Sequence, residues 1–379
     1  MITILDVLFN PDSPVMWIMI ISIIGGALAI IIRPFFTFAK FTYPNAKFES
    51  IGNPFVKEQN LQRFLELSDL QQFIDQINAN KDFQLSNTNA SDIQTALDHQ
   101  FVETIQMMKR DSTKKMHLFY DSYLQMLDAN LLKTAFKQFA SNQQIDEDLS
   151  EQAVSDTIKK QLRIISKTEP EKMNSVLDQF AYPKEIKGLL SFEKDAFSSF
   201  ALDAAIDKIL LEQLQQTKVP YKCAKAKELY LKRLIDTRTI KHILRAKNLG
   251  YDGEHCKQLL IGEGYELAFW KQEELCNAEN IKEVINKLEG TKYYQSLKKI
   301  LDTNQGLPSI QSYTDAIDRY WLEIVRNLST SFYTTIGPSL RFLEYKKIEI
   351  RNLKIITKGI AEHIPSKIIS PLLITEEAI

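Results

Sequence analysis

The N-terminal part of the chain carries a long apolar stretch without a charged side chain. Residues 15–32, VMWIMIISIIGGALAIII, form an uncharged run of 18 residues. As a helix that rises about 1.5 Å per residue, this run reaches roughly 27 Å, close to the thickness of a bilayer's hydrocarbon core. We predict a transmembrane helix over residues 15–33, preceded by an extracytoplasmic N-terminus, residues 1–14, and followed by a linker, residues 34–59.

A cleaved signal peptide is the alternative interpretation of this segment. Such a peptide begins with basic residues, whereas residues 1–14 contain Asp6 and Asp12 and neither Lys nor Arg. Ala27 and Ala29 imitate a cleavage site, but three isoleucines follow them, so the apolar region has not ended there. The pattern favours an anchor that is retained.

Charges after the apolar run predict its orientation. Arg33, Lys40 and Lys47 follow it, and positively charged flanks stay on the cytoplasmic side of a membrane. We therefore expect a single-pass protein of the cell membrane with the bulk of the chain in the cytoplasm. An aromatic cluster after Pro34 fits either an interfacial belt or a hydrophobic dock on the soluble body. Its members are Phe35, Phe36, Phe38, Phe41 and Tyr43.

Beyond the linker, apolar residues recur at helical spacing, and one pattern occurs three times. A tripeptide of two apolar residues and an aspartate appears as Ala96-Leu97-Asp98, Ala201-Leu202-Asp203 and Ala316-Ile317-Asp318. An amphipathic segment precedes each copy, and a stretch with an acid and a base follows it. We predict three homologous helical repeats over residues 60–167, 168–277 and 278–379.

The acid and the base of each repeat are separated by the same offset. The stretches read LDANLLKTAFK, IDTRTIKHILR and IEIRNLKIITK, and the pairs are Asp128 with Lys137, Asp236 with Arg245, and Glu349 with Lys358. On a helix this offset puts the two side chains on opposite sides, so they cannot pair with each other. Either the acids lie near helix N-termini and the bases near C-termini, where the helix dipole favours them, or they clamp neighbouring units together.

Composition agrees with an all-α protein and excludes several functions. Gly and Pro number only 12 each among 379 residues, which favours long helices. The formal net charge of -1 leaves no global basic field for binding nucleic acid. Cys223, Cys256 and Cys276 are an odd number without close spacing, as in a reducing compartment.

The sequence contains none of the motifs that usually carry chemistry. Its glycine-rich spots, around Gly250 and around Gly262, do not match phosphate-binding loops. The histidines are scattered, and the adjacent pair His255-Cys256 diverges on a helix, so a structural or surface role is the simpler interpretation. We predict no catalytic, cofactor-binding or metal-binding residues, no cofactor and no small-molecule substrate.

Four features resemble a known family. TYPNAKFESIGNPFV (42–56), RLIDTRTIKHILRAKNLG (233–250) and IGPSLRFLEYKKIEIRNLKIITKGI (336–360) resemble characteristic segments of the C subunit of archaeal A-type ATP synthases, which is similar to the d subunit of eukaryotic V-ATPases. The threefold repeat is the fourth feature. Two residues depart from the family pattern: Thr239 stands where Asn is usual, and Lys47 stands where Arg is usual. Any polar contact made by the usual side chains is in doubt here.

The resemblance implies a funnel-like all-α body with three homologous helical repeats about a pseudo-threefold axis. It also implies a rotor adaptor without catalytic activity that couples the membrane proteolipid ring to the central-shaft subunits D and F. The membrane helix is not implied, because the familiar members are soluble bodies. The alternatives are a membrane-tethered scaffold of the solenoid type, which exposes a long concave groove, and a membrane-bound hydrolase, which needs a polar cluster in a cleft.

Overall fold

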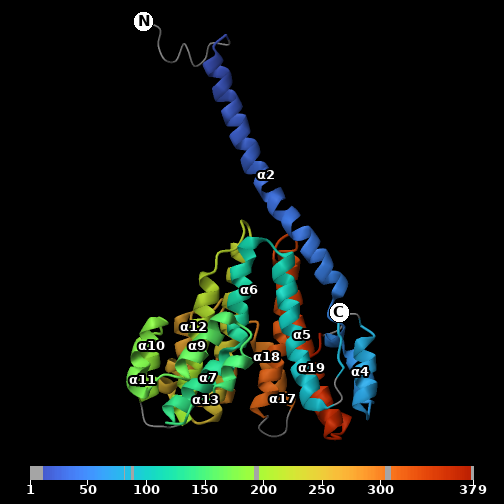
Figure 1. The fold of residues 1–379 in the computed structure, drawn as a ribbon, viewed down its shortest axis with the longest axis vertical. Helices are drawn as coiled ribbons and strands as arrows, with labels where there is room; N and C mark the ends of the chain where they lie inside the picture. Colours follow the sequence, from blue (N-terminus) through green and yellow to red (C-terminus); the bar gives the residue numbers. More distant parts are fainter. Residues whose placement is uncertain (1–11, 81, 87–88, 192–195, 304–308, 377–379) are drawn as a thin grey trace.

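The protein is all-helical, as predicted. The computed structural model describes residues 12–80, 82–86, 89–191, 196–303 and 309–376 (Figure 1). Within these ranges the extended structure consists of one isolated bridge between Lys57 and Glu376. Most of the expected extracytoplasmic segment 1–14 lies outside the described residues.

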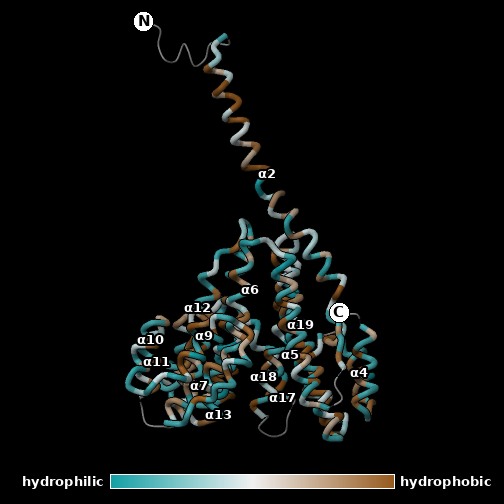
Figure 2. The backbone as a smooth tube through the Cα atoms, viewed as in Figure 1, coloured by the Kyte–Doolittle hydropathy of each residue, from teal (hydrophilic) through white to brown (hydrophobic). Residues whose placement is uncertain are grey.

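The N-terminal helix α2 (Pro14–Ile51) projects from the body as a single rod (Figure 1). None of its apolar window is buried, and it is the one helix in the described ranges that is long and apolar enough to cross a membrane. Hydrophobic residues follow one another along this projecting part (Figure 2). The helix continues through Pro34 and Pro44, so residues 34–51 of the expected linker are helical. Each proline removes one backbone hydrogen bond.

The last turns of α2 dock on the body through one face. Phe41, Pro44 and Phe48 are buried at helical spacing, and the ring of Phe48 stacks on Phe342 with centroids 5.1 Å apart. Phe35, Phe36 and Tyr43 remain exposed. The aromatic cluster is thus divided between a dock, which contains Phe41, and exposed residues near the apolar span.

Three hairpins of long helices form the centre of the body. Hairpin 1 joins α5 (Ala90–Asp111) to α6 (Lys114–Leu127) and α7 (Ala129–Ala140); hairpin 2 joins α12 (Ala196–Gln216) to α13 (Ala224–Asn248); hairpin 3 joins α18 (Ile310–Ser331) to α19 (Gly337–Ala361). The first helix of each hairpin carries one copy of the tripeptide, and the second part carries one repeated acid. The hairpins contact one another in a closed cycle, since α6 and α7 pack on α12, α13 packs on α18, and α19 packs on α5.

Short helices connect and flank the hairpins. Before hairpin 1 come η1 (Pro54–Val56), α3 (Glu58–Leu65) and α4 (Leu70–Asn78). Between hairpins 1 and 2 lie α8 (Asp148–Gln152), α9 (Asp156–Ile165), η2 (Pro170–Lys172), α10 (Met173–Gln179) and α11 (Lys184–Ser191). Between hairpins 2 and 3 lie α14 (Gly253–Gln258), α15 (Phe269–Cys276), α16 (Ile281–Lys287) and α17 (Tyr294–Thr303), and α20 (Ser366–Ile369) and η3 (Ser370–Leu372) follow hairpin 3.

The short helices before hairpin 1 pack on hairpin 3. Both η1 and α4 pack on α19, at the other end of the chain. Aromatic edges link Phe55, Phe64 and Phe73 into one core, with centroids 5.2 and 5.3 Å apart. The expected repeat 60–167 therefore begins with helices that pack on hairpin 3.

Three hydrophobic clusters among the described residues stabilise this arrangement. The largest extends from Phe41 of α2 to Leu373 and joins residues of all three hairpins. The second fills the space between α7, α9 and α12 with Phe136, Leu162 and Ile206. The third is small and joins hairpin 3 to both flanking segments, through Val56, Leu322, Tyr345, Ile348 and Ile374. Burial of each large apolar side chain contributes about 1.5–3 kcal/mol to the stability of the fold. The helices are therefore held in place, and the polar groups that they carry have fixed positions.

Candidate functional site

The repeated acid of hairpin 2, Asp236, is a fully buried side chain in the middle of α13. Its carboxylate accepts backbone N–H groups of Tyr265, Glu266 and Leu267 at 3.0–3.1 Å and the Tyr293 hydroxyl at 3.0 Å. Burial raises the pKa of Asp236, although these donors oppose the shift. The carboxylate therefore anchors the loop between α14 and α15 to α13.

The other two repeated acids hold backbone in the same way. Asp128 accepts the N–H groups of Val154 and Ser155 at 3.1 and 2.8 Å, and burial raises its pKa to about 6. Glu349 accepts the N–H of Phe55 at 2.8 Å and pairs with the buried Lys346 at 2.6 Å. Each acid thus fixes one short-helix segment to its hairpin, and the segment held by Glu349 comes from the N-terminal side of the body.

These contacts decide between the two interpretations of the acid and base pattern. For Asp236 and Glu349 the helix-N-terminus interpretation is wrong, because both lie well inside their helices. Asp128 occupies the N-cap position of α7 but its side chain does not cap that helix. All three bases, Lys137, Arg245 and Lys358, lie in last turns, as the helix-end interpretation expects. Lys137 also pairs with Asp203 of hairpin 2, as the clamp interpretation expects.

Neighbouring hairpins are joined by a different lysine, which follows each repeated acid by five residues. The pairs are Lys133 with Asp207 at 2.7 Å, Lys241 with Asp318 at 2.5 Å, and Lys354 with Asp98 at 2.5 Å. They run from hairpin 1 to 2, from 2 to 3, and from 3 back to 1. Lys137 adds a contact to Asp203 at 2.7 Å. The aspartates of all three tripeptides therefore receive a lysine from the preceding hairpin in this cycle.

A buried carboxylate connects the three hairpins at the centre. Glu344 of α19 is 2% exposed. It accepts the hydroxyls of Tyr123 on α6 and Tyr230 on α13 at 2.9 and 2.6 Å, and the indole N–H of Trp321 on α18 at 3.0 Å. Burial raises the pKa of both tyrosines well above its ordinary value, so both hydroxyls keep their protons and donate. No repeated motif in the sequence pointed to Glu344.

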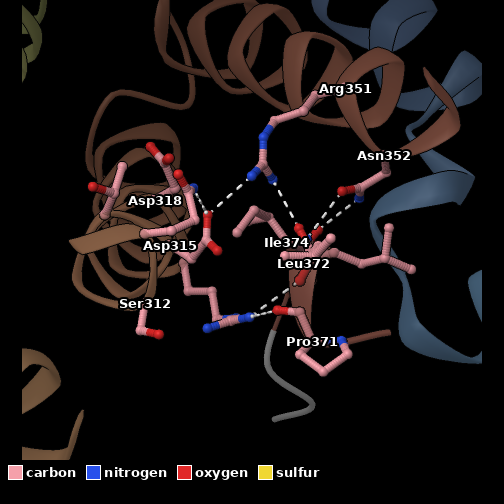
Figure 3. A network of polar contacts seen from close by, with 12 residues as sticks. Ser312, Asp315, Asp318, Arg351, Asn352, Pro371, Leu372 and Ile374 are labelled. Carbon is pink, nitrogen blue, oxygen red and sulfur yellow. Dashed lines mark hydrogen bonds and ion pairs between the residues drawn. The ribbon is translucent and has the colours of Figure 1, made fainter. Parts of the chain in front are cut away.

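The C-terminal segment folds back on hairpin 3 through a polar junction (Figure 3). The Asn352 amide donates to the Ile374 carbonyl at 2.7 Å and accepts the Ile374 N–H at 3.0 Å. It also donates to the Phe55 carbonyl at 3.2 Å. Arg351 bridges Asp315 and the Leu372 carbonyl at 2.9 and 3.2 Å. Both ends of the body are thereby attached to α19.

A cavity of about 1060 Å³ opens between α5, α7, α8 and α19. Its charged lining is divided between two walls. The acidic side chains come from α5, α8 and the start of α7, and the basic ones all come from α19: Asp98, Asp128, Asp148 and Glu151 on one side, and Lys347, Arg351, Lys354 and Lys358 on the other. The C-terminal end of α5 is tied to α2 by a 2.7 Å pair between Asp111 and Lys47, whereas the cavity is lined by residues 94–102 of α5. It therefore lies away from the membrane helix, at the opposite end of α5.

The thiols and histidines are built into the packing. All three cysteines are buried and free, and burial raises the pKa of the Cys223 and Cys276 thiols to about 12. Cys256 faces the core while its neighbour His255 is half-exposed and contacts Asp252 at 2.8 Å. In the described ranges, no group of three or more His, Cys, Asp or Glu side chains is arranged to hold a metal ion.

The two departures from the family pattern have different outcomes. Lys47 makes the ion pair with Asp111 described above. Thr239 is fully buried, and its hydroxyl has no hydrogen-bond partner in the described part of the chain. The corresponding position of hairpin 3 is Asn352, which contacts backbone in two directions. The shorter Thr239 makes no comparable contact.

The body is thus a closed cycle of helix hairpins joined by ion pairs, and it carries one apolar helix long enough to cross a membrane. Comparison with known proteins is more specific. The family model for the ATP synthase (C/AC39) subunit matches residues 44–371. The chain therefore belongs to the ATP synthase (C/AC39) subunit family and is a component of an A/V-type, membrane-associated ATP synthase.

Curated relatives are named as the C subunit of A-type ATP synthases. The protein from Methanothermobacter thermautotrophicus is 23% identical and covers 89% of both chains. That from Methanosphaera stadtmanae is 24% identical and covers 96% of both, and that from Methanocaldococcus jannaschii is 31% identical over 52% of this chain and 50% of its own.

Proposed function

We propose that this chain is a non-catalytic adaptor in the central stalk of the rotor. It connects the membrane proteolipid ring to the central-shaft subunits D and F, so that ion flow through the membrane sector turns the shaft and drives ATP synthesis in the catalytic head. The observation that supports this most directly is the rigid connection of one apolar helix to a closed body through Asn45, which donates to the Tyr333 and Thr335 carbonyls at 3.1 and 2.9 Å.

The three hairpins with their short helices are proposed to be homologous repeats about a pseudo-threefold axis. The cyclic contacts between hairpins and the cyclic lysine–aspartate pairs support this arrangement. We further propose that the third repeat is completed by η1, α3 and α4 from the N-terminal side, because Glu349 holds Phe55. A solenoid scaffold is not favoured, since α19 returns to α5 and leaves no open end.

The two ends of the body are proposed to bind different partners. The end from which α2 emerges faces the proteolipid ring on the cytoplasmic side of the membrane. The cavity at the other end, with an acidic wall and a basic wall, suits a protein surface with complementary charges, such as that of the shaft. Torque transfer needs a stiff connection between these ends, and the buried Glu344 node supplies one.

We propose that α2 lies inside the proteolipid ring and not around it. A helix that turned with the ring on its outside would collide with the stationary ion-conducting subunit in every revolution. The exposed part of α2 carries small residues on neighbouring turns, which allow close helix contact. They are Ser22, Gly25, Gly26 and Ala29.

A crosslinking experiment on the intact complex tests the adaptor role. A cysteine introduced into this chain and another in the proteolipid ring should form a disulfide that leaves ATP-driven ion pumping nearly unchanged, because both parts rotate together. A disulfide to a stator subunit should abolish pumping until it is reduced. Loss of pumping on linkage to the ring, restored by reduction, would contradict the proposal. Copurification of ring and shaft subunits in comparable amounts from solubilised membranes is the supporting measurement.

Cysteine scanning tests the position of α2 separately. Ser22 is exposed on the apolar helix, so Ser22→Cys places a thiol on its surface, and the native thiols are buried and give little background. Crosslinks confined to the inward-facing helix of the ring subunit are expected. Crosslinks to the lipid-facing helix of the ring, or to the stator, would exclude the interior position while leaving the adaptor role intact.

A further inference from the structure

A second cavity, of about 780 Å³, lies beside α2 where this helix approaches the body. One wall is α2, and the other walls are the turn between α5 and α6 and the loop between α12 and α13. Its lining consists of Gly25, Leu28, Ala29, Ile32, Arg33, Phe36, Thr37, Lys40, Thr113, Lys114, Lys115, Pro220 and Tyr221. We refer to it as the α2 groove.

The α2 groove is apolar at one end and basic at the other. Leu28 and Ile32 belong to the uncharged stretch of α2, while Arg33, Lys114 and Lys115 come together just beyond it. None of its lining residues is acidic. The nearest acid in the adjoining turn, Asp111, is already paired with Lys47 at 2.7 Å.

The cations of the α2 groove lack anionic partners in the described part of the chain. Arg33, Lys40, Lys114 and Lys115 form no ion pair there. The guanidinium of Arg33 lies over the Tyr221 ring, 4.3 Å from its centroid, which holds the charge at the wall of the groove. Lys218 and Lys222 are exposed on the adjoining loop and add positive charge.

An occupant of this groove has to satisfy both ends. The basic end favours a phosphate-bearing group, and the apolar end, continuous with the surface of the apolar helix, favours a hydrocarbon chain. Basic clusters immediately cytoplasmic of a membrane helix favour anionic lipid headgroups. We propose that the α2 groove binds one anionic phospholipid, its phosphate at Arg33, Lys114 and Lys115 and an acyl chain along Leu28 and Ile32. This inference rests on the proposed membrane insertion of α2.

Lipid binding can be measured on the purified full chain in an uncharged detergent by native mass spectrometry. We expect one phosphatidylglycerol molecule to be retained in preference to phosphatidylcholine. The double variant Lys114→Gln/Lys115→Gln should weaken phosphatidylglycerol binding by about thirtyfold. The charge-matched control Lys208→Gln/Lys282→Gln, with both residues exposed and unpaired in the described ranges, should bind as the unsubstituted chain does.

The apolar end has its own matched pair of variants. A Cβ added at Gly25 or Gly26 meets no atom within 4 Å, so both positions can accept the first atom of a side chain. Only Gly25 lines the groove. Gly25→Leu should therefore weaken lipid binding, whereas Gly26→Leu should not.

Several results would overturn the proposal. Equal retention of phosphatidylcholine and phosphatidylglycerol would contradict it. Unchanged phosphatidylglycerol binding by Lys114→Gln/Lys115→Gln, at an unchanged melting temperature, would also contradict it. Displacement of the lipid by millimolar inorganic phosphate would identify a free anion as the occupant instead. Extraction of the chain from membranes by high salt alone would contradict the membrane insertion of α2. An inserted chain without lipid preference would contradict only this inference.

Discussion

Hairpins 2 and 3 use the same acid position to hold partners at different distances along the chain. Asp236 anchors residues 265–267, which follow it closely in sequence. Glu349 anchors Phe55, from the beginning of the body. In hairpin 3 the N-terminal short helices therefore supply the segment that the acid holds. The same acid position thus anchors a nearby loop in hairpin 2, whereas in hairpin 3 it attaches the N-terminal side of the body to α19, which closes the body.

Replacing Glu349 should have the largest effect, because it breaks the closure. Glu349→Ala leaves the fully buried Lys346 without one of its two carboxylate partners, the other being Asp82. Removing one partner of a buried pair costs about 3–5 kcal/mol. We expect this loss in thermal unfolding of the solubilised chain. Hydrogen exchange should increase around residues 53–57, and a local effect at residues 265–267 instead would contradict the closure.

Gly264→Ala tests the loop anchor of hairpin 2. A Cβ at this position would lie 1.7 Å from Asp236 Oδ1, so the loop must leave the carboxylate. The expected loss of stability in thermal unfolding is on the order of 3 kcal/mol, because several hydrogen bonds to a buried charge are disrupted. Gly250→Ala is the control for a glycine that strains the backbone without a clash: φ is +80° there, but the site is open, and a loss of about 1 kcal/mol is expected. A loss at Gly264 no larger than that at Gly250 would contradict the anchor.

In hairpin 1 the corresponding acid, Asp128, should make the stability of the protein depend on pH. Its pKa is about 6 in the folded protein against an ordinary value of 3.8. The folded state therefore binds more protons between these values, and stability from this group is lost as pH rises through about 6. Acidification from pH 7 to pH 4 should stabilise the unsubstituted chain relative to Asp128→Asn by on the order of 1–3 kcal/mol. A stability difference independent of pH would contradict this assignment.

The lysines that join the hairpins should give the smallest effects. Lys133 and Asp207 are 13% and 16% exposed, whereas Lys354 and Asp98 are 32% and 59% exposed. Lys133→Met should cost about 1 kcal/mol and Lys354→Met less than about 0.5 kcal/mol, because exposed ion pairs contribute little. Chemical unfolding in detergent measures both. A larger loss for Lys354→Met would indicate that closure between hairpins 3 and 1 depends on this pair.

The sequence allowed the helical class, the apolar span and the positions of the repeated acids to be predicted, because these follow from local periodicity. It also contained the lysines five residues after each acid, although only the structure identifies their partners. The helix through Pro34 was not predicted, since its continuation depends on docking of Phe41 and Phe48 against the body. Glu344 was missed because its donors come from three distant helices, and no local pattern encodes such a meeting.

The unbroken course of α2 has a geometric consequence. Its exposed part and its docked part share one helix, so the direction in which Ser22 points is fixed relative to the face that carries Phe48. One residue inserted between them would turn the outer part by about 100°, and seven residues would restore its phase to within about 20°. The helix therefore fixes the angle, about its own axis, between the residues of its apolar part and the face that docks on the body.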